Sequence, residues 1–215
     1  MTVGCRRPPK SLLKLMLTCL TVFSIALLLT SLITSPRNNA PSEVTKFDWA
    51  AYRKDGETPA GPKIGEKINL SRLKGRNGAS LSASVGVSPI VLSIVGPGCG
   101  ACREATDQMT MVRERITGKG IGYYVTTFNY LNEPEKFFRY VDSLGVEAQP
   151  FIWAVDDSQP PPSLVEMVVP SHLLVAHNGV VLQRWPGTNY QKEVRRRMAE
   201  QIVDEALQIV SEGKD

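Results

Sequence analysis

The sequence predicts an α/β domain, a mixed β-sheet flanked by helices on both faces, preceded by one N-terminal transmembrane helix. Three observations support this prediction. Apolar runs alternate with helix-like stretches between residues 90 and 155, Asn178-Gly179 separates two further apolar runs, and a long apolar stretch lies near the N-terminus. Alternating strands and helices indicate parallel strands joined by right-handed crossovers, and the Asn-Gly hairpin adds antiparallel strands. With 215 residues, the chain can form one well-buried domain plus further segments.

Residues 15–34 are interpreted as a transmembrane signal anchor, because this uncharged and mostly apolar stretch is long enough to cross a bilayer as a helix. Residues 1–14 form a basic tail, and only Arg37 follows the span closely, so we expect the tail in the cytoplasm and the rest of the chain outside. A cleaved signal peptide is the alternative, with cleavage after Ala40.

Residues 35–60 mix Pro, Asn, Ser and charged side chains and are interpreted as a linker, so that the folded domain occupies 61–215. Within the domain, residues 64–73 predict a short edge strand and turn. The segment 76–88 is rich in Gly and Ser and predicts a loop or hairpin.

The core elements follow in order. Residues 90–95 form a short apolar run, as in a strand buried on both faces. Helical spacing over 100–117 and β-branched or aromatic residues over 121–128 predict a helix and a second strand. Asn132-Glu133-Pro134 opens a helix that closes at Gly145. The remaining predicted elements are a strand at 151–155, at most a short helix at 163–167, strands at 171–176 and 180–185, and a helix at 190–210.

The positions of the cysteines indicate a reactive pair rather than a disulfide that stabilises the fold. Cys5 is expected in the cytoplasm and Cys19 in the membrane, which leaves Cys99 and Cys102 outside. They stand at the first turn of a helix, where unpaired N–H groups and the helix dipole favour a thiolate. Closing so short a loop removes little chain entropy, so thiol–disulfide exchange explains the pair better, with Cys99 as nucleophile and Cys102 as resolving thiol.

Other interpretations of the polar residues were weighed. An inert disulfide and a zinc site are alternatives for the cysteine pair, although His172 and His177 offer no regular ligand spacing with it. We expect His177 in a solvent-facing hairpin and His172 on the sheet surface. The net charge of +4 and the cluster Arg195-Arg196-Arg197, interpreted as a solvated helix face, do not indicate a nucleic-acid partner.

Four local features occur in a characteristic order: the run 90–95 leading into Cys99-Gly-Ala-Cys102-Arg-Glu, the strand and loop at 150–163, Val168-Val169-Pro170-Ser-His-Leu-Leu-Val, and Asn178-Gly179 closing with Pro186-Gly187. In these features the chain resembles the thioredoxin fold, and it is most similar to the membrane-anchored TlpA-like and ResA-like thiol–disulfide oxidoreductases.

The resemblance implies specific roles near the cysteines. Pro170 should lie cis opposite the sulfurs, and the Val169 backbone should pair with an extended partner peptide. Val169, Pro170 and Gly98 are therefore the expected substrate-binding residues, beside the redox-active pair Cys99 and Cys102. An acid below the cysteines is also implied, and Glu147 and Glu166 are the candidates.

The resemblance further implies a single-pass protein of the bacterial inner membrane. Its catalytic domain should be monomeric and face the periplasm or the extracytoplasmic side. Its expected partners are cysteine-containing extracytoplasmic proteins, such as apocytochromes, and a membrane electron donor; no cofactor or metal is expected. Exchange in the opposite direction, in which the protein acts as a general oxidase of thiols, is the alternative. A thioredoxin-like peroxidase and a non-catalytic binding module or copper chaperone remain as alternative functions.

Overall fold

The structure is a computed structural model that describes residues 61–128, 133–154 and 160–213. The predictions for 1–14, 15–34 and 35–60 lie outside these residues. None of the helices in the described part is both long and apolar enough to span a bilayer.

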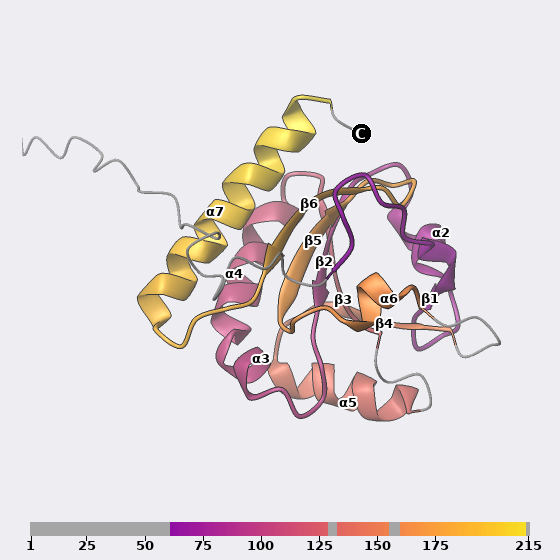
Figure 1. The fold of residues 1–215 in the computed structure, drawn as a ribbon, viewed down its shortest axis with the longest axis horizontal. Helices are drawn as coiled ribbons and strands as arrows, with labels where there is room; N and C mark the ends of the chain where they lie inside the picture. The colour runs from indigo at the N-terminus through magenta and orange to yellow at the C-terminus, as the bar shows by residue number, and fades with distance from the viewer. Residues whose placement is uncertain (1–60, 129–132, 155–159, 214–215) are drawn as a thin grey trace, which may run out of the picture. The chain divides into compact units, whose positions relative to one another are not determined.

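Six strands form one mixed sheet in the order β1-β4-β3-β2-β5-β6 (Figure 1). The central strand β2 (Ile90–Ile94) pairs in parallel with β3 (Gly122–Thr127) and in antiparallel with β5 (Ser171–Val175). On one side, β3 pairs in parallel with β4 (Gln149–Trp153), which meets the short edge strand β1 (Leu73–Lys74). On the other side, β5 pairs in antiparallel with β6 (Val181–Pro186). The predicted mixed sheet is confirmed.

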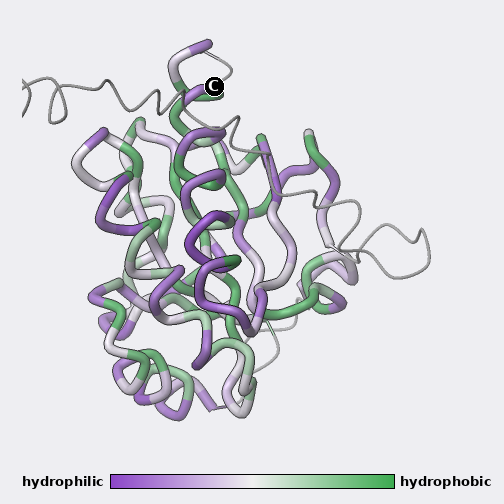
Figure 2. Tube along the Cα trace, turned by 90° about the vertical axis from the view of Figure 1, so that its left-hand side faces the viewer, coloured by the Kyte–Doolittle hydropathy of each residue, from purple (hydrophilic) through white to green (hydrophobic). Residues whose placement is uncertain are grey.

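One face of the sheet, here called the first face, is covered by three long helices: α4 (Thr106–Thr117), α5 (Pro134–Leu144) and α7 (Lys192–Ser211). Helices α4 and α5 lie on the same side because the right-handed crossovers that contain them continue in one direction, from β2 to β3 to β4. Helices α4 and α7 lie side by side (Figure 1). The outer surface of α7 is mostly hydrophilic (Figure 2), while its apolar residues join the core.

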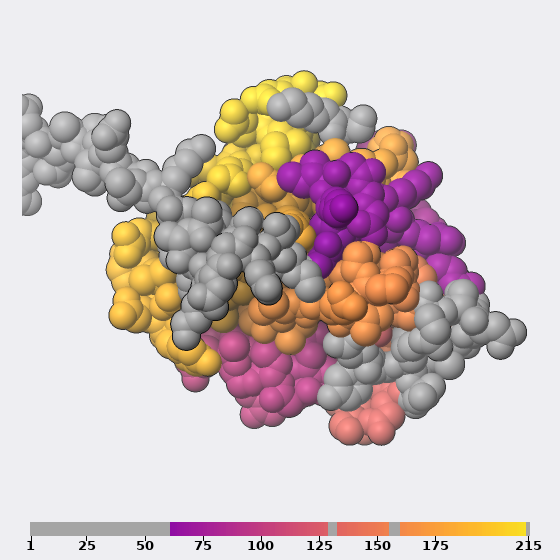
Figure 3. Space-filling view, viewed as in Figure 1, coloured from indigo at the N-terminus to yellow at the C-terminus, as the bar shows by residue number. Residues whose placement is uncertain are grey.

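The opposite face, here called the second face, is covered by shorter pieces. They are the 3-10 turn η2 (Leu70–Arg72), α2 (Leu81–Val85) and α6 (Pro162–Val165). The segment 61–75 and α6 adjoin on the surface seen in Figure 3, where the Ser163 hydroxyl donates a hydrogen bond of 2.6 Å to Glu66 Oε1. Helices therefore flank both faces, as predicted.

Two predicted segments differ from the structure. The loop or hairpin expected at 76–88 contains α2, which needs only Leu81 and Val85, one turn apart, to bury an apolar edge on the second face. The single helix expected at 100–117 is two helices, α3 (Gly100–Glu104) and α4. They join at the buried Ala105, whose φ of −85° and ψ of 6° interrupt the helical geometry.

The Asn178-Gly179 hairpin forms as predicted. The N–H of Gly179 donates to the Ala176 carbonyl at 2.8 Å, and its φ is +92°. A Cβ on residue 179 would stand 2.1 Å from the Ile68 carbonyl oxygen, so both the turn and the close approach of the segment at Ile68 require glycine.

Candidate functional site

The cysteine pair lies at the start of helix α3, shortly after strand β2 ends. Cys99 is the N-cap residue of α3, and its Sγ accepts a hydrogen bond of 3.0 Å from the Cys102 N–H. The two cysteines are joined by a disulfide; Cys99 is half-buried and Cys102 is fully buried. One N–H group of the first turn, that of Cys102, therefore contacts the outer sulfur, as expected from the sequence, and stabilises negative charge on it once the bond is reduced.

The loop before β5 meets the cysteines. The Val169–Pro170 peptide bond is cis, and the Val169 carbonyl oxygen lies 3.7 Å from Cys99 Sγ. This confirms the expected placement of Val169 and Pro170 opposite the sulfurs, from a segment seventy residues away in sequence. Gly98 is exposed beside Cys99 with a φ of +85°, and a Cβ there would have no neighbour within 4 Å. The roles of these three residues toward a substrate stay predictions.

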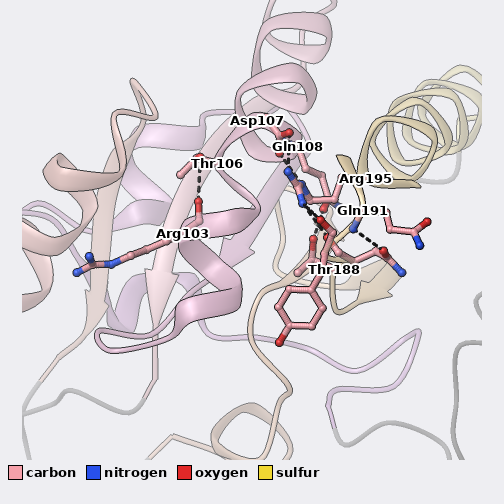
Figure 4. Close-up of polar contacts among 9 residues, drawn as sticks. Arg103, Thr106, Asp107, Gln108, Thr188, Gln191 and Arg195 are labelled. Atoms are coloured by element: carbon pink, nitrogen blue, oxygen red, sulfur yellow. Dashed lines mark hydrogen bonds and ion pairs between the residues drawn. The ribbon is translucent and has the colours of Figure 1, made fainter. Parts of the chain in front are cut away.

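A partly buried polar cluster centred on Arg195 joins α4, α7 and the segment after β6 (Figure 4). The Arg195 guanidinium donates to both carboxylate oxygens of Asp107, at 2.8 and 3.0 Å, and to the carbonyls of Asn189 and Tyr190. Through Arg195, α7 thus holds both the start of α4 and the segment after β6. That segment begins at Gly187, whose N–H donates to the Pro170 carbonyl at 2.8 Å.

The interpretation of Arg195-Arg196-Arg197 as a solvated face is wrong for its first member. Arg195 is 6% exposed, whereas Arg196 and Arg197 face solvent. Burial disfavours the charge on Asp107 more than any single contact favours it. The hydrogen bonds from Arg195 and the Gln108 N–H, together with the positive charges of Arg195 and Lys192, outweigh burial and hold the pKa of Asp107 below its usual value. A second link in the cluster is buried as well, because the Thr188 hydroxyl donates to Gln108 Oε1 at 2.7 Å. Arg103 points away from the cluster (Figure 4) and is exposed.

The expectation that His172 lies on the sheet surface is wrong. His172 has 0% exposure, and its Nδ1 lies 2.7 Å from Ser93 Oγ, which donates to the Tyr123 hydroxyl at 2.8 Å. Burial lowers the pKa of His172 to about 4 and raises the pKa of Tyr123 well above its usual value. The prediction for His177 is confirmed, because it is exposed in the hairpin turn.

Neither predicted acid is buried beneath the cysteines. Glu166 is exposed, and Glu147 has an 82% exposed side chain that pairs with Arg113 at 2.9 Å. Sequence reasoning therefore missed the buried network of Ser93, Tyr123 and His172. A weak signal existed, because Ser93 is the one polar residue in the apolar run 90–95 and His172 stands two positions after Pro170.

The described residues contain no group of three or more His, Cys, Asp or Glu side chains placed to hold a metal ion.

Comparison with known proteins identifies the fold. No protein-family model matches the chain, and no curated protein matches its sequence. Among solved structures, a candidate thiol:disulfide interchange protein DsbE from Chlorobium tepidum is 20% identical, with a TM-score of 0.50 over 67% of this chain and 98% of that one. The thioredoxin domain of a thiol-disulfide oxidoreductase from Bacteroides vulgatus is 14% identical, with a TM-score of 0.51 over 69% of this chain and 99% of that one. The domain has a thioredoxin-like fold.

A third structure fits the same description. A thiol:disulfide interchange protein from Bacteroides sp. is 14% identical, with a TM-score of 0.50 over 66% of this chain and 89% of that one. Each of these proteins is matched over most of its own length. At such identities the likeness establishes the fold alone.

Proposed function

We propose that this chain is a membrane-anchored, extracytoplasmic thiol–disulfide oxidoreductase that reduces disulfides in specific partner proteins. The observation that carries the proposal is the meeting of the Cys99–Cys102 disulfide with the cis Val169–Pro170 peptide, at 3.7 Å from Cys99 Sγ to the Val169 carbonyl oxygen. Because the domain combines a thioredoxin-like fold with two cysteines that can form a disulfide, thiol–disulfide exchange is better supported than a purely structural disulfide.

The geometry assigns the two sulfurs different steps. In the reduced protein, the half-buried Cys99 thiolate attacks a partner disulfide and forms a mixed disulfide, while one partner sulfur leaves as a thiolate. Cys102 then attacks Cys99 Sγ, which releases the second partner sulfur and forms the Cys99–Cys102 disulfide. A dithiol electron donor returns the pair to its reduced form with two electrons. Cys99 is the outer sulfur because Cys102 is fully buried.

The cis peptide gives the partner a place to bind. Val169 is half-buried beside Cys99, so its backbone can pair with an extended segment that carries the partner cysteine. Gly98, the residue before Cys99, adds an exposed surface without a side chain. The partner class that fits this arrangement is a cysteine-containing polypeptide in an extended conformation, such as an apocytochrome segment.

The membrane location is proposed from the sequence. The apolar stretch 15–34 follows a basic tail and precedes the domain, which supports a single-pass anchor in a bacterial inner membrane with a membrane electron donor nearby. Fractionation of cells, followed by alkaline extraction and protease treatment of spheroplasts, tests this. Release by alkali, or protection of the domain from protease, contradicts the proposal.

Trapping tests the exchange chemistry. In a Cys102→Ser variant the mixed disulfide cannot be resolved, so we expect adducts of Cys99 with extracytoplasmic proteins on non-reducing gels, sensitive to dithiothreitol. Cys99→Ser, which keeps Cys102 buried, is the matched control and should give none. Absence of adducts from Cys102→Ser in cells contradicts the proposed function.

A further inference from the structure

One buried charge in the domain is not used by the exchange steps proposed above. Among the described residues, Arg195 is the only lysine, arginine, aspartate or glutamate that is buried, with 6% exposure. Taking a guanidinium out of water is costly unless its donors are filled, and apolar side chains at such a position often give equal or greater stability. Packing alone therefore does not explain why a charged residue with several partners stands here.

On one side, Arg195 holds the helices that carry the cysteines. It donates to both carboxylate oxygens of Asp107, at 2.8 and 3.0 Å, and Asp107 lies in the first turn of α4. The joint between α3 and α4 stays hydrogen-bonded, because the Ala105 N–H donates to the Ala101 carbonyl at 3.0 Å. The two-point contact with Asp107 therefore holds the start of α4 and, through it, the turn of α3 that contains the cysteine pair.

On the other side, Arg195 holds the segment 187–190. Its Nη1 donates to the carbonyls of Asn189 and Tyr190, at 3.0 and 2.8 Å. The same segment begins with the Gly187 N–H, which donates to the Pro170 carbonyl at 2.8 Å. Because Pro170 is the second residue of the cis peptide, the segment connects Arg195 to the loop opposite the sulfurs.

A second buried contact joins the same two parts of the chain. Thr188 Oγ1 donates a hydrogen bond of 2.7 Å to Gln108 Oε1, and both residues are buried. Figure 4 shows this region between the start of α4 and the segment 187–190. Since Gln108 follows Asp107 directly, the segment is attached to one turn of α4 at two neighbouring points.

The sheet alone does not fix the geometry of the exchange site. The last ladder pair between β2 and β5 is Ile94 with Ser171, and both the cysteine pair and the cis peptide lie beyond it. Cys99 Sγ and the Val169 carbonyl oxygen, 3.7 Å apart, thus belong to chain outside the strands. Their relative position depends on contacts outside the sheet, and those of Arg195 connect the two sides.

We propose that Arg195 is a positioning residue of the exchange site, which holds the cis Val169–Pro170 peptide in the alignment with Cys99 that an extended partner segment requires. The proposal rests on the proposed exchange function and on the pairing of the Val169 backbone with the partner. Arg195 acts through Asp107 on the helix side and through the segment 187–190 on the loop side. Without it the cysteines still react, but the backbone that aligns the partner is displaced.

This role predicts a difference between two kinds of disulfide. A small disulfide needs only access to Cys99 Sγ and makes no use of the Val169 backbone. A disulfide within an extended polypeptide gains rate from the backbone hydrogen bonds that align its sulfur with Cys99. Arg195 should therefore matter for polypeptides and not for small disulfides.

Stopped-flow absorbance with two matched probes tests this difference on the reduced protein. One probe is N-acetylcysteine amide and the other is a short unstructured peptide with one central cysteine; in both, the cysteine forms a disulfide with thionitrobenzoate. The Cys99 thiolate attacks the cysteine sulfur, and thionitrobenzoate leaves with the electron pair of the broken bond. The release rate at several probe concentrations gives the half-saturating concentration and the maximal rate.

In the wild type, we expect the peptide probe to react faster than the small probe. In Arg195→Met, which removes the donors but keeps a long side chain, half-saturation by the peptide should need an about 10-fold higher concentration, as for the loss of one or two backbone hydrogen bonds. The small probe should react at its wild-type rate. Arg195→Lys, which keeps the charge and a donor, should restore part of the peptide reaction.

Two controls separate positioning from a general loss of stability. Leu92 is fully buried on the second face, so Leu92→Ala destabilises the domain more than Arg195→Met does, yet both probes should react as with the wild type. Arg196→Met removes the exposed arginine at the next position of α7 and should also match the wild type. Asp107→Asn should weaken the peptide reaction, and the double variant with Arg195→Met should be no worse than Arg195→Met alone, because the two residues form one connection.

The outcomes distinguish the two proposals. One equivalent of 5,5′-dithiobis(2-nitrobenzoate) should release two thiolates from the wild type, one for each cysteine that reacts, and release of only one means that the proposed function fails. If two are released but Arg195→Met changes the reactions of both probes equally, or of neither, the role of Arg195 is wrong and the exchange function stands. A wild type that does not prefer the peptide contradicts the alignment by Val169 on which this role depends.

Discussion

The two faces of this sheet are both buried at its central strands, but they carry different chemistry. Strands β2 and β5 are buried along their whole length, so each face is packed beneath helices or turns. The second face consists of aliphatic and aromatic side chains with small hydroxyls at Thr126 and Ser171. The first face holds the buried ionisable groups of the described domain: Cys102, Tyr123, Tyr140, His172 and, at its border, Arg195.

The difference shows what packing alone requires. The second face forms a full core without a buried ionisable group in the described residues, so a thioredoxin-like sheet does not need one for stability. Burying His172 with an unpartnered nitrogen lowers stability compared with an apolar side chain. The polar groups gather on the face where the redox cysteines lie, which is where the thiol–disulfide exchange is proposed.

The strongest test of this comparison removes packing from the second face. Leu92 has 0% exposure there, and Leu92→Ala leaves a cavity, so we expect the free energy of unfolding to fall by about 3 kcal/mol. Urea denaturation measures the loss. Both stopped-flow probes should react at their wild-type rates at a temperature where the variant is folded; a slower reaction of the peptide would show that the two faces are not separable.

The second test uses the pH dependence of stability. The unfolded chain binds a proton at His172 below pH 6.5, but the folded chain does so only below about 4. The free energy of unfolding therefore falls as the pH drops from 6.5 to 4, by about 3 kcal/mol from this group. His172→Gln should remove that slope and His177→Gln should keep it. Urea titrations at several pH values measure both, and an equal slope in His172→Gln would contradict the buried neutral histidine.

The smallest expected change in the free energy of unfolding comes from Arg195, at the border of the first face. Arg195→Met removes the donors to Asp107 and to two carbonyls, and we expect a loss of about 2 kcal/mol, since Asp107 is partly exposed and solvent screens its charge. Arg196→Met breaks exposed pairs with Glu193 and Glu200 and should cost less than about 1 kcal/mol. Thermal unfolding of both variants gives the comparison. Equal losses would show that the buried cluster does not anchor the segment after β6.

Local patterns were enough to predict much of the fold and of the site. The apolar run 90–95, the Asn178-Gly179 turn and the helix closed by Gly145 each depend on neighbouring residues, and each forms where expected. The cysteine pair and the cis Val169–Pro170 peptide were anticipated from motif order. Helix α2 was missed because it rests on two apolar contacts with the sheet, which a Gly- and Ser-rich segment does not reveal.

The sequence by itself determined the order of the elements and the dithiol at a helix start, because turn chemistry, capping and apolar runs act over a few residues. The proline opposite the dithiol was implied by the resemblance to a known family. Only the tertiary structure decided that His172 and Arg195 are buried while Glu147 and Glu166 are exposed. A strand buried on both faces has no polar–apolar alternation to show which way a residue points. What covers each side chain depends on helices contributed by distant parts of the chain.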